Sequence, residues 1–235
     1  MDYCTLNAKT YLSKYKIVSM IKEAVEKETP LSLVRIGDGE NIVMAQEKVL
    51  SLEWISKNVA WRNDHNYCGI VLPNLEARDR CMQAVRNADL VGVFAGDKLT
   101  ERIFKAFKIT PKNIFYAFEN VYLPMYKPFV RLIRDHPPLL VGRPAKSFAK
   151  YLFEKLKIRV PGTVLVDSYE DIDTCIKNMV NIPHKWSLIS AGVNALIIAN
   201  EMATKHGKVA IDFGHAPDNV MSPVYKDYWL ANPDD

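Results

Sequence analysis

The sequence has few of the features that mark secreted, membrane-spanning or zinc-binding proteins. Its four cysteines (Cys4, Cys68, Cys81 and Cys175) include no CxxC pair, so their spacing indicates neither a zinc site nor a disulfide framework. Free thiols in a reducing compartment are the expected state. No apolar run approaches the roughly 20 residues of a membrane span, and the first residues lack the basic and apolar regions of a secretory signal. We therefore expect a soluble, cytoplasmic protein without a transmembrane segment.

A strong excess of one charge is also absent. The chain has 31 Lys and Arg residues against 27 Asp and Glu residues, a formal net charge of +4, and the basic residues are spread along it. A dedicated nucleic-acid binder concentrates basic residues on one face. We therefore expect no nucleic-acid partner, whereas an anionic small substrate is compatible with this charge. Hydrophobic residues make up 49% and charged residues 25% of the chain, as in ordinary globular proteins.

The 235 residues contain no internal repeat, low-complexity tract or long linker, so we predict one domain over residues 1–235. Short apolar segments alternate with segments of helical periodicity, which predicts an α/β fold with a mostly parallel sheet and helices on both faces. Strands are predicted at 31–36, 69–72, 90–95, 113–118, 139–142, 163–166, 187–190 and 208–213. Helices are predicted at 11–28, within an N-terminal helical segment of about 5–28, and at 51–55, 75–87, 99–107, 124–135, 145–156, 171–180 and 193–205. The tail, about 219–235, is expected to lie across the surface.

One short stretch combines glycines and carboxylates directly after a predicted strand. The apolar strand 31–36 is followed by Gly37-Asp38-Gly39-Glu40 and by the apolar start of a helix at Ile42. The two glycines allow positive φ and a close approach of a ligand to the backbone, and the two carboxylates can aim at one point. Such carboxylates at a helix start suit a divalent cation, Mn²⁺ or Mg²⁺, held together with a phosphate. A tight turn in which Asp38 and Glu40 only favour the helix start is equally compatible with this pattern.

Polar residues also follow the other predicted strands, where ligands of open α/β sheets bind. They are Gly96-Asp97, Arg143, Asp167-Ser168, Ala191-Gly192-Val193-Asn194 and Gly214-His215. This asymmetry between apolar strands and polar strand ends indicates an active rim. A lone histidine is often structural, but carboxylates on the same rim favour His215 as a general base, phosphate donor or metal ligand.

Three further sites on or near this rim each allow two interpretations. The turn around Gly192 and Asn194 either cradles a phosphate or packs a helix tightly against the sheet, and it lacks the GxGxxG dinucleotide fingerprint. Asp97 is either a site residue or the N-cap of the next helix. Arg62, beside Trp61 in an irregular segment, either pairs with a diphosphate while the indole stacks on a base, or belongs to a surface loop.

Three segments together resemble the GT-D fold glycosyltransferases, a bacterial family long catalogued as a domain of unknown function. They are Arg35-Ile36-Gly37-Asp38-Gly39-Glu40, the strand-turn-helix 190–203, and Ala210-Ile211-Asp212-Phe213-Gly214-His215. The resemblance implies a Rossmann-like sheet that binds a nucleotide-diphosphate sugar, a UDP-sugar in the first instance, with a divalent metal.

The family's motifs also imply roles for individual residues. Asp38 and Glu40 would hold the metal, Arg35, Gly37 and Gly39 would complete the nucleotide-sugar pocket, and Asp212 and His215 would lie near the sugar or the diphosphate. From the rim itself, we add Asn41, Arg62, Gly192 and Asn194 to the nucleotide-sugar site. We also add Asp97 to His215 and Asp212 as candidate catalytic residues. Two departures from the family leave the donor and acceptor open. They are the turn Ser-Ala-Gly-Val-Asn-Ala at 190–195 and a tail after His215 that differs from the family's usual acidic one.

The predicted function is metal-dependent transfer of a sugar to a bacterial surface glycan or glycoprotein, by a chain that could form a homo-oligomer. Two alternatives use the same rim. One is a metal-dependent nucleotide phosphohydrolase, and the other is a noncatalytic nucleotide-sugar-binding subunit.

Overall fold

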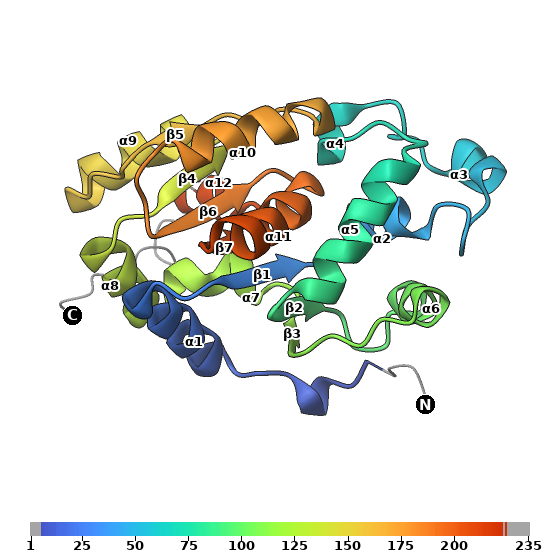
Figure 1. Cartoon of the computed structure of the whole chain (residues 1–235), viewed down its shortest axis with the longest axis horizontal. Helices are drawn as coiled ribbons and strands as arrows, with labels where there is room; N and C mark the ends of the chain where they lie inside the picture. The colour runs from blue at the N-terminus through green and yellow to red at the C-terminus, as the bar shows by residue number, and fades with distance from the viewer. Residues whose placement is uncertain (1–5, 223, 225–235) are drawn as a thin grey trace.

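The computed structural model describes residues 6–222 and 224, which form one seven-stranded sheet and its covering helices (Figure 1). The strand order is β3-β2-β1-β7-β6-β4-β5, and every pairing is parallel. The strands are β1 (Leu31–Arg35), β2 (Leu90–Val93), β3 (Ile114–Tyr116), β4 (Leu139–Gly142), β5 (Thr163–Val164), β6 (Trp186–Ser190) and β7 (Val209–Asp212). The predicted mostly parallel sheet is thereby confirmed, and all seven carboxyl ends meet at one edge.

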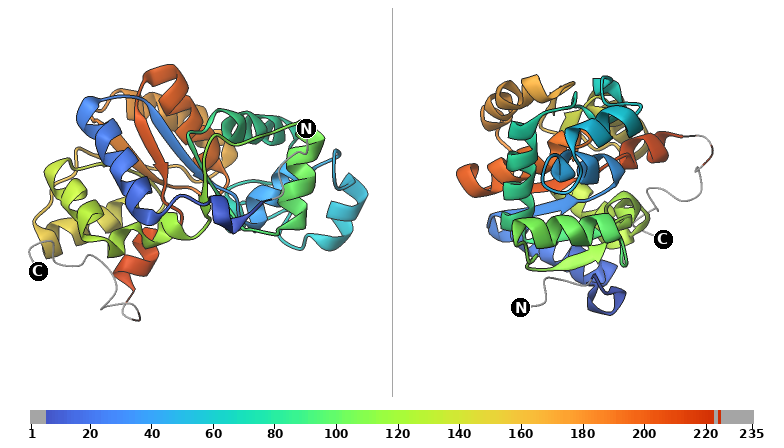
Figure 2. Two further views of the ribbon diagram at one scale, coloured as in Figure 1. Left: turned by 90° about the horizontal axis from the view of Figure 1, so that it is seen from below. Right: turned by 90° about the vertical axis from the view of Figure 1, so that its right-hand side faces the viewer.

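The helices lie in two layers. One layer contains α2 (Asp38–Ala45), α3 (Leu52–Asn58), α4 (His65–Cys68), α5 (Leu75–Asn87), α6 (Lys98–Phe107), α10 (Ile172–Val180) and α11 (Asn194–His206). The other contains α1 (Lys14–Lys27), α7 (Glu119–Tyr122), α8 (Lys127–Asp135), α9 (Ala145–Leu156) and α12 (Ala216–Met221). Figure 2 shows the blue α1 and the orange α11 on opposite sides of the sheet.

Alternation along the strands explains the two layers. Leu33 of β1 belongs to the core beneath α1 and α8, and its neighbour Val34 belongs to the core beneath α5 and α11, because successive side chains of a strand point to opposite faces. Connections that run along the sheet toward β3 cross the α5–α11 side, and those that run toward β5 cross the α8–α9 side. All crossovers therefore share one handedness, as parallel sheets require.

Most predicted elements are confirmed, and three corrections concern the site. The predicted strand at 69–72 is a loop: Gly69, with φ +88°, ends α4, and the N–H of Leu72 donates to the carbonyl of Arg62. The helix after β1 begins at Asp38 rather than at Ile42. The last two residues of the predicted irregular segment 61–66 belong to α4.

At the two ends of the chain, the first long helix begins at Lys14, capped by Ser13, after a 3-10 turn at Ala8–Thr10. Residues 219–221 of the predicted tail belong to α12, whereas 223 and 225–235 lie outside the described residues. None of the helices within 6–222 combines the length and the apolar character that crossing a bilayer demands.

Candidate active site

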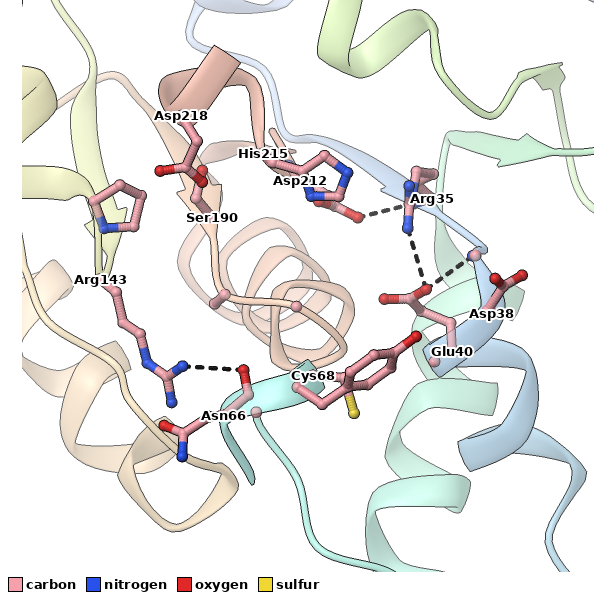
Figure 3. Close-up of a pocket in the computed structure, with 18 of the residues that line it drawn as sticks. Arg35, Asp38, Glu40, Asn66, Cys68, Arg143, Ser190, Asp212, His215 and Asp218 are labelled. Atoms are coloured by element: carbon pink, nitrogen blue, oxygen red, sulfur yellow. Dashed lines mark hydrogen bonds and ion pairs between the residues drawn. The ribbon is translucent and has the colours of Figure 1, made fainter. Parts of the chain in front are cut away.

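A cavity of about 880 Å³ opens at the carboxyl edge of the sheet (Figure 3). Each of the seven strands contributes to its wall, at or just after its end. In the order of the sheet these residues are Phe118, Phe94, Arg35, Asp212, Ser190, Arg143 and Asp167. The wall thus runs from aromatic residues beyond β3 and β2, through a charged centre beyond β1 and β7, to polar residues beyond β4 and β5.

The charged centre begins with the turn between β1 and α2. Oε2 of Glu40 accepts a hydrogen bond from the backbone N–H of Gly37 at 2.8 Å and lies 3.5 Å from Nη2 of Arg35. Glu40 is buried, with 5% of its surface exposed, so the guanidinium partner offsets the cost of burying its charge. One carboxylate oxygen therefore closes the first turn of α2 and orients Arg35 along the cavity wall.

The two glycines of this turn leave room for neighbouring side chains, and neither supplies a left-handed backbone conformation. Neither has a positive φ, contrary to the expectation from the sequence. A Cβ on Gly37 would lie 2.2 Å from Nη2 of Arg35, and one on Gly39 would lie 3.1 Å from Cβ of Cys68. The close neighbours are thus the protein's own side chains.

Asp38 and Glu40 both line the cavity, but their carboxylates do not aim at one point. Figure 3 shows the Asp38 carboxylate directed away from that of Glu40. The reason is that α2 begins at Asp38, and side chains two residues apart on a helix project from different sides. Within 6–222 and 224, no three histidine, cysteine, aspartate or glutamate side chains are grouped closely enough to hold a metal ion.

This donor set still fits one kind of divalent cation. Mg²⁺ and similar hard cations need only one or two protein carboxylates when substrate phosphates and waters complete the shell. Among the residues that the structure describes, the partners of Glu40 bind Oε2, which leaves Oε1 for a cation. Asp38 is exposed at the rim. The residues suit an ion that arrives with a diphosphate, and they do not form a closed protein cage.

The end of β7 supplies the second half of the charged centre. Oδ2 of Asp212 accepts the backbone N–H of Arg35 at 3.1 Å, and Oδ1 accepts that of Gly214 at 3.0 Å. Burial raises the pKa of Asp212 to about 7, against the lowering effect of Arg35. Because both oxygens hold backbone groups, Asp212 joins β1 to the turn that carries His215, as a positioning residue.

His215 and Asp218 line the same wall of the cavity. Partial burial, followed by the positive charge of Arg35, lowers the pKa of His215, while Asp218 and Glu40 raise it. A lowered pKa keeps the imidazole neutral at pH 7 and able to accept a proton. The sequence analysis did not select Asp218, which lies on α12 rather than at a strand end.

Asp97 and Asn41 do not line the cavity. Asp97 caps α6, since its Oδ1 accepts the N–H groups of Leu99 and Thr100 at 2.9 and 3.4 Å. Its Oδ2 accepts Nδ2 of Asn41 at 2.8 Å, and Oδ1 of Asn41 lies 2.9 Å from the Thr100 hydroxyl. Both side chains are thus used to join α2 to α6, so this geometry supports the N-cap interpretation of Asp97.

The glycine-containing turn before α11 is tightly packed. The N–H of Val193 donates to Cys68 O, and Nδ2 of Asn194 donates to Gly69 O, both at 3.0 Å. A Cβ on Gly192 would lie 2.5 Å from Cys68 O. Gly192 lines the cavity, but these contacts agree with the packing interpretation of the turn. The Arg62 guanidinium lies against Val59 O at 3.4 Å, outside the cavity lining.

Several lining residues were missed or underrated from the sequence. Arg143 lies opposite Arg35 in Figure 3 and is held by the carboxylate of Asp167 and by Asn66 O. Phe94 and Phe118 lie at the ends of predicted strands, and the rule that selected polar strand ends would have found them if it had included aromatic residues. Tyr67 lies in a segment with no legible periodicity, so no signal pointed to it.

Comparison with known proteins agrees with this architecture. A solved structure of the highly conserved domain of unknown function 1792, described as having a distinct glycosyltransferase fold, is similar to 87% of this chain and 83% of its own, with a TM-score of 0.50 and 16% identity. The chain matches no curated protein. The family model for the GT-D fold-like domain matches residues 12–220, which include every strand and the whole cavity wall. The chain therefore belongs to the GT-D-like family.

Proposed function

We propose that this protein is a glycosyltransferase that moves a sugar from a nucleotide-diphosphate donor, a UDP-sugar, to a bacterial surface glycan or glycoprotein, with Mn²⁺ or Mg²⁺ bound. The observation that carries the proposal is the meeting, at one cavity of a GT-D-like fold, of Arg35 and two carboxylates with a neutral histidine. Anion-binding groups and a proton acceptor are what transfer from a diphosphate leaving group to a hydroxyl requires.

The donor's diphosphate would lie beside Arg35. Its guanidinium is anchored on one side by Glu40, and an arginine held in this way presents its remaining N–H donors in a fixed fork to phosphate oxygens. Glu40 would hold the cation through Oε1, and Asp38 would join it by turning its exposed side chain toward Glu40. When bound, a divalent cation offsets the charge that develops on the leaving diphosphate.

His215 would accept the proton of the attacking acceptor hydroxyl if configuration inverts. The neutral imidazole faces the cavity from the wall that Asp212 fixes through the N–H of Gly214. Asp218, on the same wall, supplies a negative charge that favours the imidazolium formed when the proton is taken up. These residues orient the acceptor and carry the proton, whereas Arg35 serves the donor.

The test is a thermal-shift screen of nucleotide sugars with and without Mn²⁺, followed by a transfer assay with bacterial glycan and glycoprotein extracts. We expect one nucleotide sugar to raise the melting temperature more with Mn²⁺ than without it, and to yield a glycosylated product. Phosphate release without an acceptor would favour a phosphohydrolase, and binding without any product would favour a noncatalytic subunit. Turnover undiminished by EDTA would remove the metal from the proposal.

A further inference from the structure

Tyr67 forms an exposed aromatic surface in the cavity wall. Its ring lies against that of Trp61 in a nearly parallel stack, with 4.7 Å between ring centroids and 15° between ring planes. Trp61 is half-buried and packs on the hydrophobic core. Tyr67 is 56% exposed and lines the cavity. One face of the tyrosine is thus supported by the indole, and the other is open to a planar ligand.

The segment that carries Tyr67 is fixed by hydrogen bonds to the residues on each side of it. Nη1 of Arg143 donates to Asn66 O at 3.2 Å, and Cys68 O accepts the N–H of Val193 at 3.0 Å. These contacts tie the residues on each side of Tyr67 to the ends of β4 and β6. An aromatic ring held in this way loses little conformational freedom when a ligand stacks on it.

The position of Tyr67 relative to the charged centre indicates which part of the donor would lie against it. Cys68, the next residue, packs against Gly39 in the turn that contains the two carboxylates, so the ring lies beside the proposed diphosphate site. Figure 3 shows Asn66 and Cys68 across the cavity from His215 and Asp218. The acceptor hydroxyl must reach His215, which leaves the Tyr67 side to the nucleoside.

We infer that the open face of Tyr67 is the platform on which the nucleobase of the donor stacks, in the order Trp61, Tyr67, base. The inference rests on the proposed function and adds its nucleoside subsite. Stacking on an aromatic ring is available to any base because each has a π-face. Tyr67 therefore supplies affinity for a nucleoside diphosphate, and selection between bases falls to other groups.

Calorimetric titration of the full chain with two probes tests this inference. Uridine diphosphate carries a base, and inorganic pyrophosphate does not. In the presence of Mn²⁺, Tyr67→Ala and Tyr67→Leu are expected to weaken the binding of uridine diphosphate about tenfold and to leave the binding of pyrophosphate unchanged. Tyr67→Phe keeps the ring and is expected to bind both probes like the unaltered protein. Tyr15→Ala, at a tyrosine 68% exposed on α1 and outside this cavity, is the matched control.

The outcomes separate this inference from the proposed function. If uridine diphosphate binds equally well to the unaltered protein, Tyr67→Ala and Tyr67→Leu, the platform is wrong and the glycosyltransferase proposal stands. If the binding of both probes weakens equally in these variants, Tyr67 acts on the diphosphate, and the inference of a stacking platform is again wrong. If the unaltered protein binds neither uridine diphosphate nor adenosine or guanosine diphosphate, both proposals fail.

Discussion

Nη2 of Arg35 lies 3.5 Å from Oε2 of Glu40, and the two side chains are only 13% and 6% exposed. The pair joins the end of β1 to the first turn of α2 at the charged centre of the cavity. Because the same oxygen accepts the N–H of Gly37, Glu40 has a structural contribution that must be separated from any part in binding a cation.

Two substitutions of Glu40 make this separation. Glu40→Ala removes the acceptor of the Gly37 N–H and leaves Arg35 without this partner, so we expect the free energy of unfolding to fall by about 2 kcal/mol. Glu40→Gln keeps an oxygen for the Gly37 N–H and is expected to cost less than about 1 kcal/mol. Both variants should lose the Mn²⁺-dependent rise in melting temperature with the donor. A Gln variant that keeps the full rise would show that Glu40 only supports the fold.

Helix α11 is flanked by a matched pair of glycines, Gly192 before it and Gly207 at its C-cap. Gly192 and Gly207 both have positive φ, +57° and +66°, but a Cβ on Gly192 would meet Cys68 O at 2.5 Å, whereas one on Gly207 would meet nothing within 4 Å. We expect Gly207→Ala to lower the free energy of unfolding by about 1 kcal/mol through backbone strain. Gly192→Ala should cost about 2 kcal/mol more, because the contact with Cys68 must open. Urea unfolding of both variants measures the difference, and equal costs would contradict the packing interpretation.

Substitutions of Asp97 test whether a residue that follows a strand at the rim contributes to activity or only to stability. Asp97→Ala removes the N-cap of α6 and the partner of Asn41, so the free energy of unfolding should fall by about 2 kcal/mol. The kcat and KM of the folded variant should stay within about twofold of the unaltered values, because the side chain does not line the cavity. Asp97→Ser restores the cap alone and should recover part of the stability. A tenfold fall in kcat in either folded variant would return Asp97 to the catalytic candidates.

The sequence predicted elements well where the local pattern is sufficient. Helices α5 and α9 and strand β4 have the predicted bounds, because apolar spacing and flanking polar residues mark them within a short window. The segment 69–72 shows the limit of such a pattern. Ile70 and Leu72 are buried like strand residues, but Gly69 takes φ +88° and the segment pairs with Arg62 instead of with a strand.

In the candidate site, too, some features could be predicted from the sequence and others could not. Residues that follow strands were brought together, since carboxyl ends of parallel strands share one edge. The directions of side chains could not be predicted, because they depend on where a helix begins. Since α2 begins at Asp38, the carboxylates of Asp38 and Glu40 diverge. The bond between Asn41 and Asp97 links residues 56 positions apart, and no local spacing indicates it.

The pH dependence of transfer tests the base. Because its surroundings lower the pKa of His215, the imidazole becomes neutral at a pH below the usual value near 6.5. The value of kcat/KM, measured with the donor and acceptor found in the screen, should therefore rise with pH to a plateau, and the midpoint of the rise should lie below about pH 6.5. His215→Gln should lower the plateau about 100-fold or more and remove this limb. Asp218→Asn removes a charge that raises the pKa of His215. In this variant the rise of kcat/KM should therefore move to lower pH, and the plateau should be largely kept. If kcat/KM still rises at the unaltered pH in Asp218→Asn and in His215→Gln, the rise reports another group. That group, and not His215, would then be the base.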